Sequence, residues 1–252
     1  MKYKDDYCTA NEMSCSKELG KIMESKVLGK GNTAEVIEYG KESVCKLFLE
    51  GYPKEYAALE LHNAKIMKQE GIPVPEVYGI VEKNSRVGII YERIYGQSLM
   101  EVLFQERNAA FVFDLLISLQ QELFKHHSKE LISYKDFLIE SMREKGVRND
   151  FLKKKILLLP EGDFICHGDF HPGNIILKPD QTAVVIDFMN VCCGRWEYDV
   201  ARTYVILAEF SESMSERLKG IFIADVYLEK MNVQYGDIKE YVEIISEYRR
   251  FE

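Results

Sequence analysis

Two carboxylates and an amide follow short apolar runs in the second half of this chain. The stretch from Cys166 to Leu177 reads CHGDFHPGNIIL, with Asp169 and Asn174 in a polar loop between two strand-like segments. Asp187 follows a third apolar run, Ala183 to Ile186. Carboxylate and amide oxygens are the hard ligands that Mg²⁺ prefers, and a carboxylate can accept the proton of an attacking hydroxyl. This set suits phosphoryl transfer, with Asn174 and Asp187 as candidate metal ligands and Asp169 as candidate base.

These residues also have a purely structural interpretation. Asp, Pro, Gly and Asn are common turn formers, so any one of them alone would indicate a turn. Here they occur together in a loop with an apolar strand on each side, and such a scaffold holds functional loops in place. The combination therefore favours a catalytic and metal-binding role over a purely structural turn.

A glycine-rich segment near the start of the chain could bind phosphates. It reads GKGNTAEV from Gly29 to Val36, and main-chain amides in such a loop can approach phosphates because few side chains intervene. Lys46 follows at the centre of an apolar run, VCKLF at 44–48. Taken separately, the glycines would indicate a hairpin turn and Lys46 an outward-facing strand residue.

The motif HGDFHPGN followed by VVIDF resembles the catalytic segment of the aminoglycoside phosphotransferase and choline kinase family. The spacing from Asp169 to Asn174 equals that of the protein-kinase pattern H-R-D-x-x-x-x-N, with Gly168 in place of the arginine. Asp187 begins D-F-M where protein kinases have D-F-G. The resemblance extends from about residue 26 to about residue 205 and implies small-molecule kinase activity in a bilobal protein-kinase-like fold.

The resemblance implies a role for each candidate residue. Asp169 would orient and deprotonate the acceptor hydroxyl, while Asn174 and Asp187 would hold Mg²⁺. Lys46 would bind the α- and β-phosphates of ATP or GTP. The glycine-rich segment would cover these phosphates with Gly29, Gly31, Asn32, Thr33 and Ala34.

Two more parts of the nucleotide site follow from the same resemblance. The phosphate-binding lysine needs a carboxylate on the following helix, and the family register favours Glu60, with Glu55 as the alternative. The strand end YERI, which contains Glu92 and Ile94, resembles the hinge whose main chain holds the adenine. Side chains there do not distinguish ATP from GTP.

The surrounding sequence predicts the elements that position these residues. The first third alternates strand signals with turns and contains one helical stretch, from Pro53 to about Gln69. Helical patterns dominate the rest, at 98–127, at 133–145 and in three stretches after about residue 197. We therefore expect an α+β protein with a β-rich nucleotide-binding lobe and a larger helical catalytic and acceptor-binding lobe. The expected lobes are residues 1–95, of which 1–25 are unassigned, and residues 96–252.

The composition argues against some classes of partner and location. The chain has 252 residues, of which 46% are hydrophobic and 29% charged, as in ordinary globular proteins. A net charge of −8 without a basic run argues against nucleic-acid binding. Short apolar runs and a charged N-terminal segment predict a cytoplasmic protein without a membrane span. Six scattered cysteines without a C-x-x-C pair predict reduced thiols, and no feature of the sequence specifies an oligomeric state.

A protein kinase is the nearest alternative within the fold. Its activation segment needs room to dock a peptide, but only eleven residues separate Asp187 from Asp199. A small hydroxylated acceptor such as an aminoglycoside, amino alcohol or sugar is therefore favoured. Asp199 itself, near the start of a helix, is interpreted as a helix N-cap.

Two alternatives lie outside kinase activity. A metal-dependent hydrolase could use the H-x-D-x-H cluster His167, Asp169 and His171, but this hypothesis leaves the glycine-rich segment and Lys46 unexplained. A nucleotide-binding pseudokinase would have lost one of the key residues, and all of them are present.

The nature of the acceptor could be reflected in acidic residues of the C-terminal third. Such residues could meet a cationic acceptor, but the solvated face of amphipathic helices is the favoured interpretation. They include Glu209, Glu212, Glu216, Asp225 and Glu229.

Overall fold

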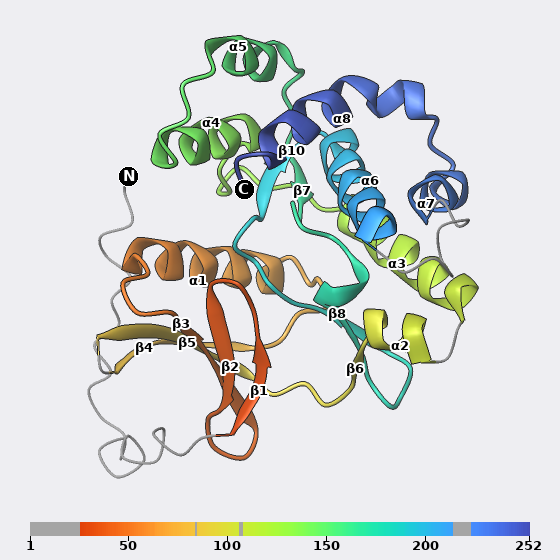
Figure 1. The fold of residues 1–252 in the computed structure, drawn as a ribbon. Coiled ribbons are helices and arrows are strands. Elements are labelled where there is room, and N and C mark those ends of the chain that lie inside the picture. Colours follow the sequence, from red (N-terminus) through yellow and green to blue (C-terminus); the bar gives the residue numbers. More distant parts are fainter. Residues whose placement is uncertain (1–25, 84, 106–107, 214–222) are drawn as a thin grey trace. The chain divides into compact units, whose positions relative to one another are not determined.

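The computed structural model describes residues 26–83, 85–105, 108–213 and 223–252. The chain divides into two compact units (Figure 1). Unit 1 comprises Met1–Tyr95 and Val184–Met189, and unit 2 comprises Gly96–Ala183 and Asn190–Glu252. Residues 184–189, which the expected 96–252 lobe includes, thus cluster with the N-terminal part of the chain. In the described ranges, no helix has the length and apolar character needed to cross a membrane.

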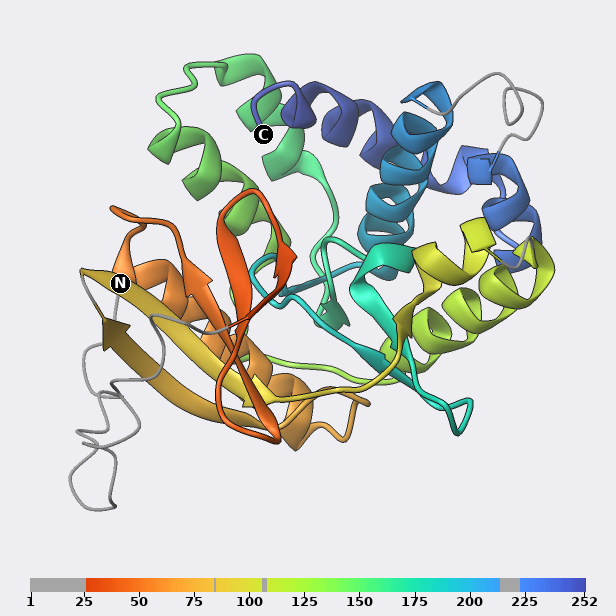
Figure 2. The same ribbon diagram turned by 60° about the horizontal axis from the view of Figure 1, so that its bottom comes forward.

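Unit 1 is built on an antiparallel sheet in the order β1-β2-β3-β5-β4 (Figures 1 and 2). Its single described helix, α1, packs against β4 and β5. These elements are β1 (Val27–Lys30), β2 (Ala34–Glu38), β3 (Ser43–Phe48), α1 (Lys54–Gln69), β4 (Val77–Lys83) and β5 (Arg86–Glu92). The predicted strands and the helix after Pro53 are therefore present.

The central strand β3 carries apolar side chains on one face of the sheet and a lysine on the other. Cys45 and Leu47 are buried and pack with Ile37 of β2 on one face of the sheet. Lys46 lies between them and pairs in register with β2 and β5. Since successive side chains on a strand point to opposite faces, Lys46 points away from this cluster. It meets α1 on the other face.

Unit 2 is mainly helical (Figure 1). In its core α6 packs against α7 and α8, and α3 packs against α7. The helices are α2 (Leu99–Gln105), α3 (Ala109–Leu123), α4 (Tyr134–Glu144), α5 (Asp150–Leu158), α6 (Trp196–Ser213), α7 (Ile223–Met231) and α8 (Tyr235–Arg249). The predicted α+β class is confirmed, with the sheet in the N-terminal region and the helices in the C-terminal region.

The helix predicted over 98–127 is two helices, and it ends earlier than expected. α3 stops at Leu123, and His127 then forms an isolated bridge with Phe164. The His127 ring also bonds the Asp163 carboxylate at 2.8 Å. The predicted helix end at residue 127 is therefore wrong, because His127 pairs with a distant segment of the chain instead of continuing the helix.

Short strands hold the polar loop of unit 2. β7 (Phe164–Cys166) pairs with β10 (Cys192–Gly194), and β6 (Gln97–Ser98) pairs with β8 (Ile175–Leu177). β9 (Ala183–Val185) carries the chain out of unit 2. The loop between β7 and β8 contains a 3₁₀ turn, Pro172–Asn174. Two strands therefore fix the ends of the loop that carries Asp169.

The described cysteines are buried free thiols. Cys166 faces Cys192 across the β7–β10 pair, and burial raises the pKa of the Cys166 thiol well above its usual range. Cys45 behaves similarly, since burial raises the pKa of its thiol to about 12. Cys8 and Cys15 lie outside the described residues.

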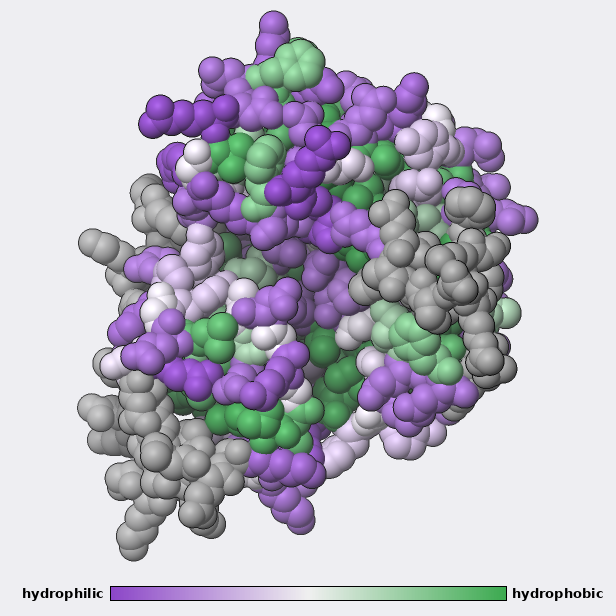
Figure 3. All heavy atoms as spheres, in the orientation of Figure 1, coloured by the Kyte–Doolittle hydropathy of each residue, from purple (hydrophilic) through white to green (hydrophobic). Residues whose placement is uncertain are grey.

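Hydrophilic residues cover much of the face shown in Figure 3, with hydrophobic residues in smaller groups between them. One such group lies near the top of the view, where α5 is located. On α5, Phe151, Leu157 and Leu158 are exposed.

Candidate active site

In unit 1, Lys46 is held between two carboxylates. Its Nζ donates to both oxygens of Glu60, at 2.8 and 2.9 Å, and to Asp187 Oδ1 at 2.9 Å. Glu60 lies on α1 and is fully buried, and the Tyr91 hydroxyl donates to it at 3.1 Å. Glu55 is exposed in the first turn of the same helix. Of the two candidate partners, Glu60 is therefore the one that contacts Lys46.

The charges of this cluster depend on burial and on each other. Burial opposes the charge of Lys46, but the Glu60 and Asp187 carboxylates outweigh it and raise the pKa of the ammonium. Burial raises the pKa of Glu60, with Lys46 acting in the opposite direction. Lys46 is therefore cationic at neutral pH, as binding a polyanion requires.

Asp187 sits on a strained but well-anchored segment of unit 1. Its φ of 69° is in the left-handed region, which few residues other than glycine adopt. On either side, Val185 N donates to Pro73 O at 2.8 Å and Asn63 Nδ2 donates to Phe188 O at 2.9 Å. The Asp187 side chain remains 41% exposed. Such strain persists where surrounding contacts fix it, and it is concentrated at functional positions.

The donor atoms of Asp187 suit a hard cation. Its Oδ1 accepts from Lys46, and within the described part of the chain Oδ2 has no hydrogen-bond partner. A carboxylate oxygen is a ligand that Mg²⁺ prefers.

The glycine-rich segment forms the turn between β1 and β2. Gly31 N donates to Ala34 O, and Leu49 N donates to Thr33 O, each at 2.9 Å. A Cβ on Gly29 would meet nothing within 4 Å, and a Cβ on Gly31 would lie 3.6 Å from Ala34 O. The fold itself therefore does not require glycine at either position.

At the end of β5, the predicted hinge residues differ in their main-chain bonding. Glu92 N donates to Glu76 O at 2.9 Å, and Glu76 N donates back to the Glu92 carboxylate at 3.0 Å. For Ile94, by contrast, no main-chain hydrogen bond to another described residue is found. The Ile94 peptide groups are thus available to a ligand with donor and acceptor edges.

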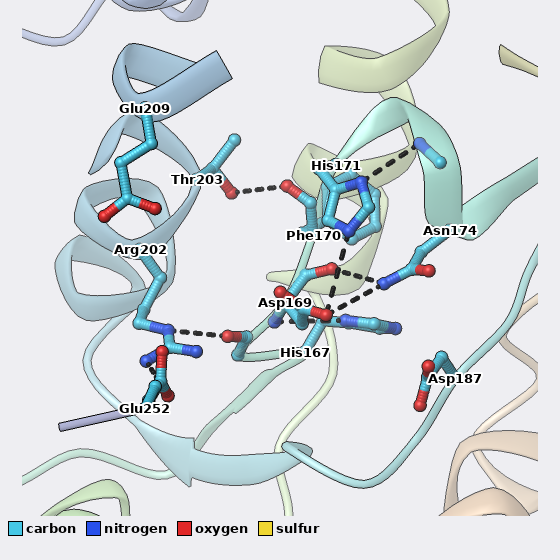
Figure 4. Close-up of polar contacts among 12 residues, drawn as sticks. His167, Asp169, Phe170, His171, Asn174, Asp187, Arg202, Thr203, Glu209 and Glu252 are labelled. Carbon is cyan, nitrogen blue, oxygen red and sulfur yellow. Dashed lines mark hydrogen bonds and ion pairs between the residues drawn. The ribbon is translucent and has the colours of Figure 1, made fainter. Parts of the chain in front are cut away.

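In unit 2, the loop between β7 and β8 holds Asp169 in a network of polar contacts (Figure 4). Asn174 Nδ2 donates to the Asp169 main-chain oxygen at 2.9 Å and to Asp169 Oδ2 at 3.1 Å. His171 Nε2 lies 3.7 Å from the same Oδ2. Because the amide nitrogen of Asn174 faces Asp169, its amide oxygen is the atom that can ligate a metal.

The Asp169 carboxylate is stabilised in its ionised form. Burial opposes ionisation, but the imidazole of His171, the Arg202 guanidinium and the imidazole of His167 outweigh burial and lower the pKa of Asp169 well below its usual range. The side chain is nevertheless 28% exposed. Asp169 is therefore a partly accessible carboxylate at any pH near neutrality.

The loop is held from behind by one face of α6. Asp199 Oδ1 accepts from Gly168 N at 2.7 Å, Arg202 Nε donates to Gly168 O at 2.7 Å, and Thr203 Oγ1 donates to Phe170 O at 2.9 Å. Residues three and four apart share a helix face, so one helix supplies all three contacts. Gly168 has a φ of +74°, and a Cβ there would lie 2.3 Å from Asn190 O. Only glycine fits this position.

Asp199 is not the N-cap that the sequence suggests. It lies inside the first turn of α6, which begins at Trp196, and its fully buried carboxylate also accepts from Gln120 Nε2 at 2.9 Å. Gln120 of α3 in turn accepts from the Tyr227 hydroxyl at 2.6 Å. Sequence reasoning missed Gln120, Arg202 and Thr203. For Arg202 and Thr203, the available signal was polar residues at helical spacing inside the apolar run after Tyr198.

The H-x-D-x-H residues support the loop. His167 Nδ1 accepts from Asp169 N at 3.3 Å, and His171 Nδ1 accepts from Gly173 N at 3.0 Å. Among the residues that the structure describes, no group of three or more His, Cys, Asp or Glu side chains could hold a metal ion.

Two units of this kind, a sheet with a buried lysine–glutamate pair and a helical unit with an HGDxxxxN loop, define the class of protein-kinase-like phosphotransferases. The family model described as the phosphotransferase enzyme family (APH) matches residues 26–225. The chain therefore belongs to this family, as the sequence motifs predict, and it is a phosphotransferase with an alcohol group as acceptor. A comparison with curated protein sequences finds no match.

Solved structures with the same fold are aminoglycoside phosphotransferases. An aminoglycoside-3′-phosphotransferase of type VIII is 15% identical with a TM-score of 0.64, over 89% of this chain and 93% of that one. APH(3″)-Id from Streptomyces rimosus, in complex with ADP and streptomycin, is 13% identical with a TM-score of 0.61, over 87% and 91%. APH(2″)-IIa, in complex with gentamicin, is 16% identical with a TM-score of 0.59, over 96% and 89%. The predicted protein-kinase-like fold is thus confirmed.

Proposed function

We propose that this protein transfers the γ-phosphoryl group of ATP or GTP to a hydroxyl group of a small molecule. The observation that carries the proposal is the Lys46 ammonium bound to both oxygens of the buried Glu60. A buried ion pair of this kind fixes one cation in place, and a fixed cation is what an incoming triphosphate requires. Family membership supplies the reaction class.

In this proposal the nucleotide binds unit 1. Lys46 binds the α- and β-phosphates, and Glu60 orients it. The main chain of Gly29, Gly31, Asn32, Thr33 and Ala34 approaches the phosphates, while the main chain at Glu92 and Ile94 holds the base. The absence of any steric need for glycine at positions 29 and 31 supports the phosphate role.

Mg²⁺ is part of the proposal, with Asp187 and Asn174 as its ligands. Each residue offers an oxygen that its other contacts leave available, Oδ2 of Asp187 and Oδ1 of Asn174. When bound, Mg²⁺ supplies positive charge that stabilises the phosphate oxygens during transfer.

Asp169 acts on the acceptor. A carboxylate with a lowered pKa is a weak base, so Asp169 first orients the hydroxyl by accepting its hydrogen bond. It takes the proton as the acceptor oxygen bonds to the γ-phosphorus and the hydroxyl becomes acidic. The bond between the γ-phosphorus and the β–γ bridging oxygen breaks, and the nucleoside diphosphate leaves.

The acceptor is proposed only as a class of small hydroxylated molecules, which includes aminoglycosides, amino alcohols and sugars. The complexes with streptomycin and gentamicin are properties of those relatives. Among the acidic candidates in this chain, Glu209 is bonded to Arg249, and the Asp225 carboxylate lies 3.4 Å from the Tyr204 hydroxyl. The side chains of Glu212 and Glu216 lie outside the described residues. A cytoplasmic location stays a prediction.

The deciding experiment measures ADP or GDP release from Mg²⁺–nucleotide over a panel of acceptors. The panel contains aminoglycosides, choline, ethanolamine, homoserine, methylthioribose and sugars, with Asp169→Ala measured in parallel. Turnover that depends on an acceptor and is lost in the variant supports the proposal. Nucleotide binding without turnover on a wide panel would favour a pseudokinase. Absence of both nucleotide binding and turnover would overturn the proposed function.

A further inference from the structure

A fully buried arginine lies behind the loop that carries Asp169 (Figure 4). Arg202 is 1% exposed, and its Nε donates to Gly168 O at 2.7 Å. Its Nη1 donates to Glu252 Oε1 at 2.9 Å. The guanidinium group thus binds a loop carbonyl and a carboxylate with different nitrogens, which its planar fork allows.

Glu252 is itself fixed by the end of α8. Its Oε2 accepts from Arg249 Nη1 at 2.7 Å, and Glu252 N donates to Arg249 O at 3.2 Å in the turn that follows the helix. Arg249 Nε also donates to both oxygens of Glu209 on α6, at 2.9 and 3.0 Å. The Glu252 carboxylate therefore bridges two arginines, only one of which touches the loop.

Because Arg202 is buried, it depends on Glu252 for a counter-charge. A guanidinium group removed from water needs a counter-charge, and a carbonyl such as Gly168 O supplies only a partial one. The charges of Asp169 and of the buried Asp199 also act on Arg202. Without Glu252, the buried guanidinium would be drawn away from Gly168 O, toward one of these carboxylates or toward water.

We propose that Arg202, held in place by Glu252, is a positioning residue that fixes Asp169 through the Gly168 carbonyl. The inference rests on the proposed function, in which Asp169 orients and deprotonates the acceptor hydroxyl. Arg202 and Glu252 belong to unit 2, whereas the proposed nucleotide-binding residues belong to unit 1, so we expect substitutions at these two positions to change the reaction step. Misplacement of a reacting group by about 1 Å can slow a reaction by about 10²-fold.

The test compares Glu252→Ala with Glu252→Gln and Glu209→Ala. Glu209→Ala is the matched control, because it removes a carboxylate from the same Arg249 and leaves Arg202 bound to Glu252 and Gly168. ADP release is measured with the best acceptor of the panel and with water as acceptor. Hydrogen exchange is followed in parallel in a peptide that spans residues 167–174.

We expect Glu252→Ala to lower kcat about tenfold, with KM for the nucleotide changed less than about twofold. Glu252→Gln retains an acceptor for Arg202 and should recover part of kcat, and Glu209→Ala should behave as wild type. Hydrogen exchange at 167–174 should be faster in Glu252→Ala alone.

Unchanged kcat and exchange in Glu252→Ala would overturn the inference, and so would equal losses in Glu252→Ala and Glu209→Ala. If the wild-type protein transfers phosphate to no acceptor, the proposed function fails. The exchange measurement then still decides whether Glu252 fixes the loop.

Discussion

Lys46 Nζ and Asp187 Oδ1 lie 2.9 Å apart, although the two residues are 141 positions apart in the chain. The same ammonium binds both oxygens of Glu60, so one cation is shared by two carboxylates. In the proposed function, Lys46 and Asp187 have other partners, the phosphates and Mg²⁺. In the absence of nucleotide and metal, the two side chains are therefore bonded to each other instead of to these ligands.

This relationship predicts that the effect of Asp187→Ala on nucleotide binding depends on metal. With Mg²⁺ present, the variant should bind ADP at least about tenfold more weakly, because a charged metal ligand is lost. Without metal, its affinity should be unchanged or higher, because Lys46 is released from one carboxylate. Calorimetric titration with ADP, with Mg²⁺ or with EDTA, measures both values. An equal loss of ADP affinity with Mg²⁺ and with EDTA would exclude Asp187 as a metal ligand.

Lys46→Met should weaken nucleotide binding under all conditions. The variant removes the cation proposed for the α- and β-phosphates, so the Kd for ADP should rise about tenfold or more. Lys54→Met is a suitable control, because Lys54 is exposed and pairs with Glu82. A similar Kd in the two variants would contradict the role of Lys46.

Asp169→Asn should separate binding from chemistry. The amide cannot take the acceptor proton, so kcat should fall by about 10²–10⁴, while the Kd for nucleotide stays near that of the wild type. Single-turnover measurement of ADP release together with nucleotide titration gives both quantities. A kcat close to that of the wild type would exclude Asp169 as the base.

The lowered pKa of Asp169 predicts a pH dependence of stability. Its ordinary pKa is 3.8, and the folded value is lower. The ionised carboxylate therefore contributes stability that is present above the ordinary pKa and is lost as the pH falls toward the folded one. Asp169→Asn lacks this contribution, so the wild type should lose stability relative to the variant between about pH 5 and pH 3. Thermal unfolding of both proteins across this range measures the difference. A constant difference in Tm would contradict the interpretation.

Two glycines should respond to alanine in contrasting ways. Gly168→Ala forces a Cβ onto Asn190 O at a positive φ, and the free energy of unfolding should fall by roughly 2–4 kcal/mol. Gly31→Ala meets no such contact, so its stability should be close to that of the wild type while its KM for nucleotide rises. Denaturant unfolding and steady-state kinetics on both variants separate the two effects. A stable Gly168→Ala protein would contradict the packing described here.

The candidate site residues were easier to select from the sequence than the elements around them were to predict. The loop from His167 to Asn174 and Lys46 were selected because of their combination and spacing, since each residue alone is ordinary in a turn or a strand. β10 was missed because Cys192–Gly194 is too short for a periodic pattern and exists only through its pairing with β7. Periodicity reports local amphipathic character, whereas such pairings are set by distant parts of the chain.

The buried polar residues behind the loop likewise could not be predicted from local sequence, because their partners lie in distant parts of the chain. Gln120 is polar in sequence and would be placed on the solvated face of α3, yet it is fully buried between Asp199 and Tyr227. Nothing in a single helix indicates that its polar side chain has partners on two other helices. The roles proposed for the site residues stay predictions until the variants are measured.

The return of residues 184–189 to unit 1 sets an order for the assembly of the newly made chain. Asn63 and Lys46 are synthesised more than a hundred positions before Phe188 and Asp187, whose main chain and carboxylate they bind. A ribosome that has released only the first strands and α1 has therefore produced a unit that still lacks these partners. The part of the protein that is translated first reaches its final packing only after most of unit 2 has been translated.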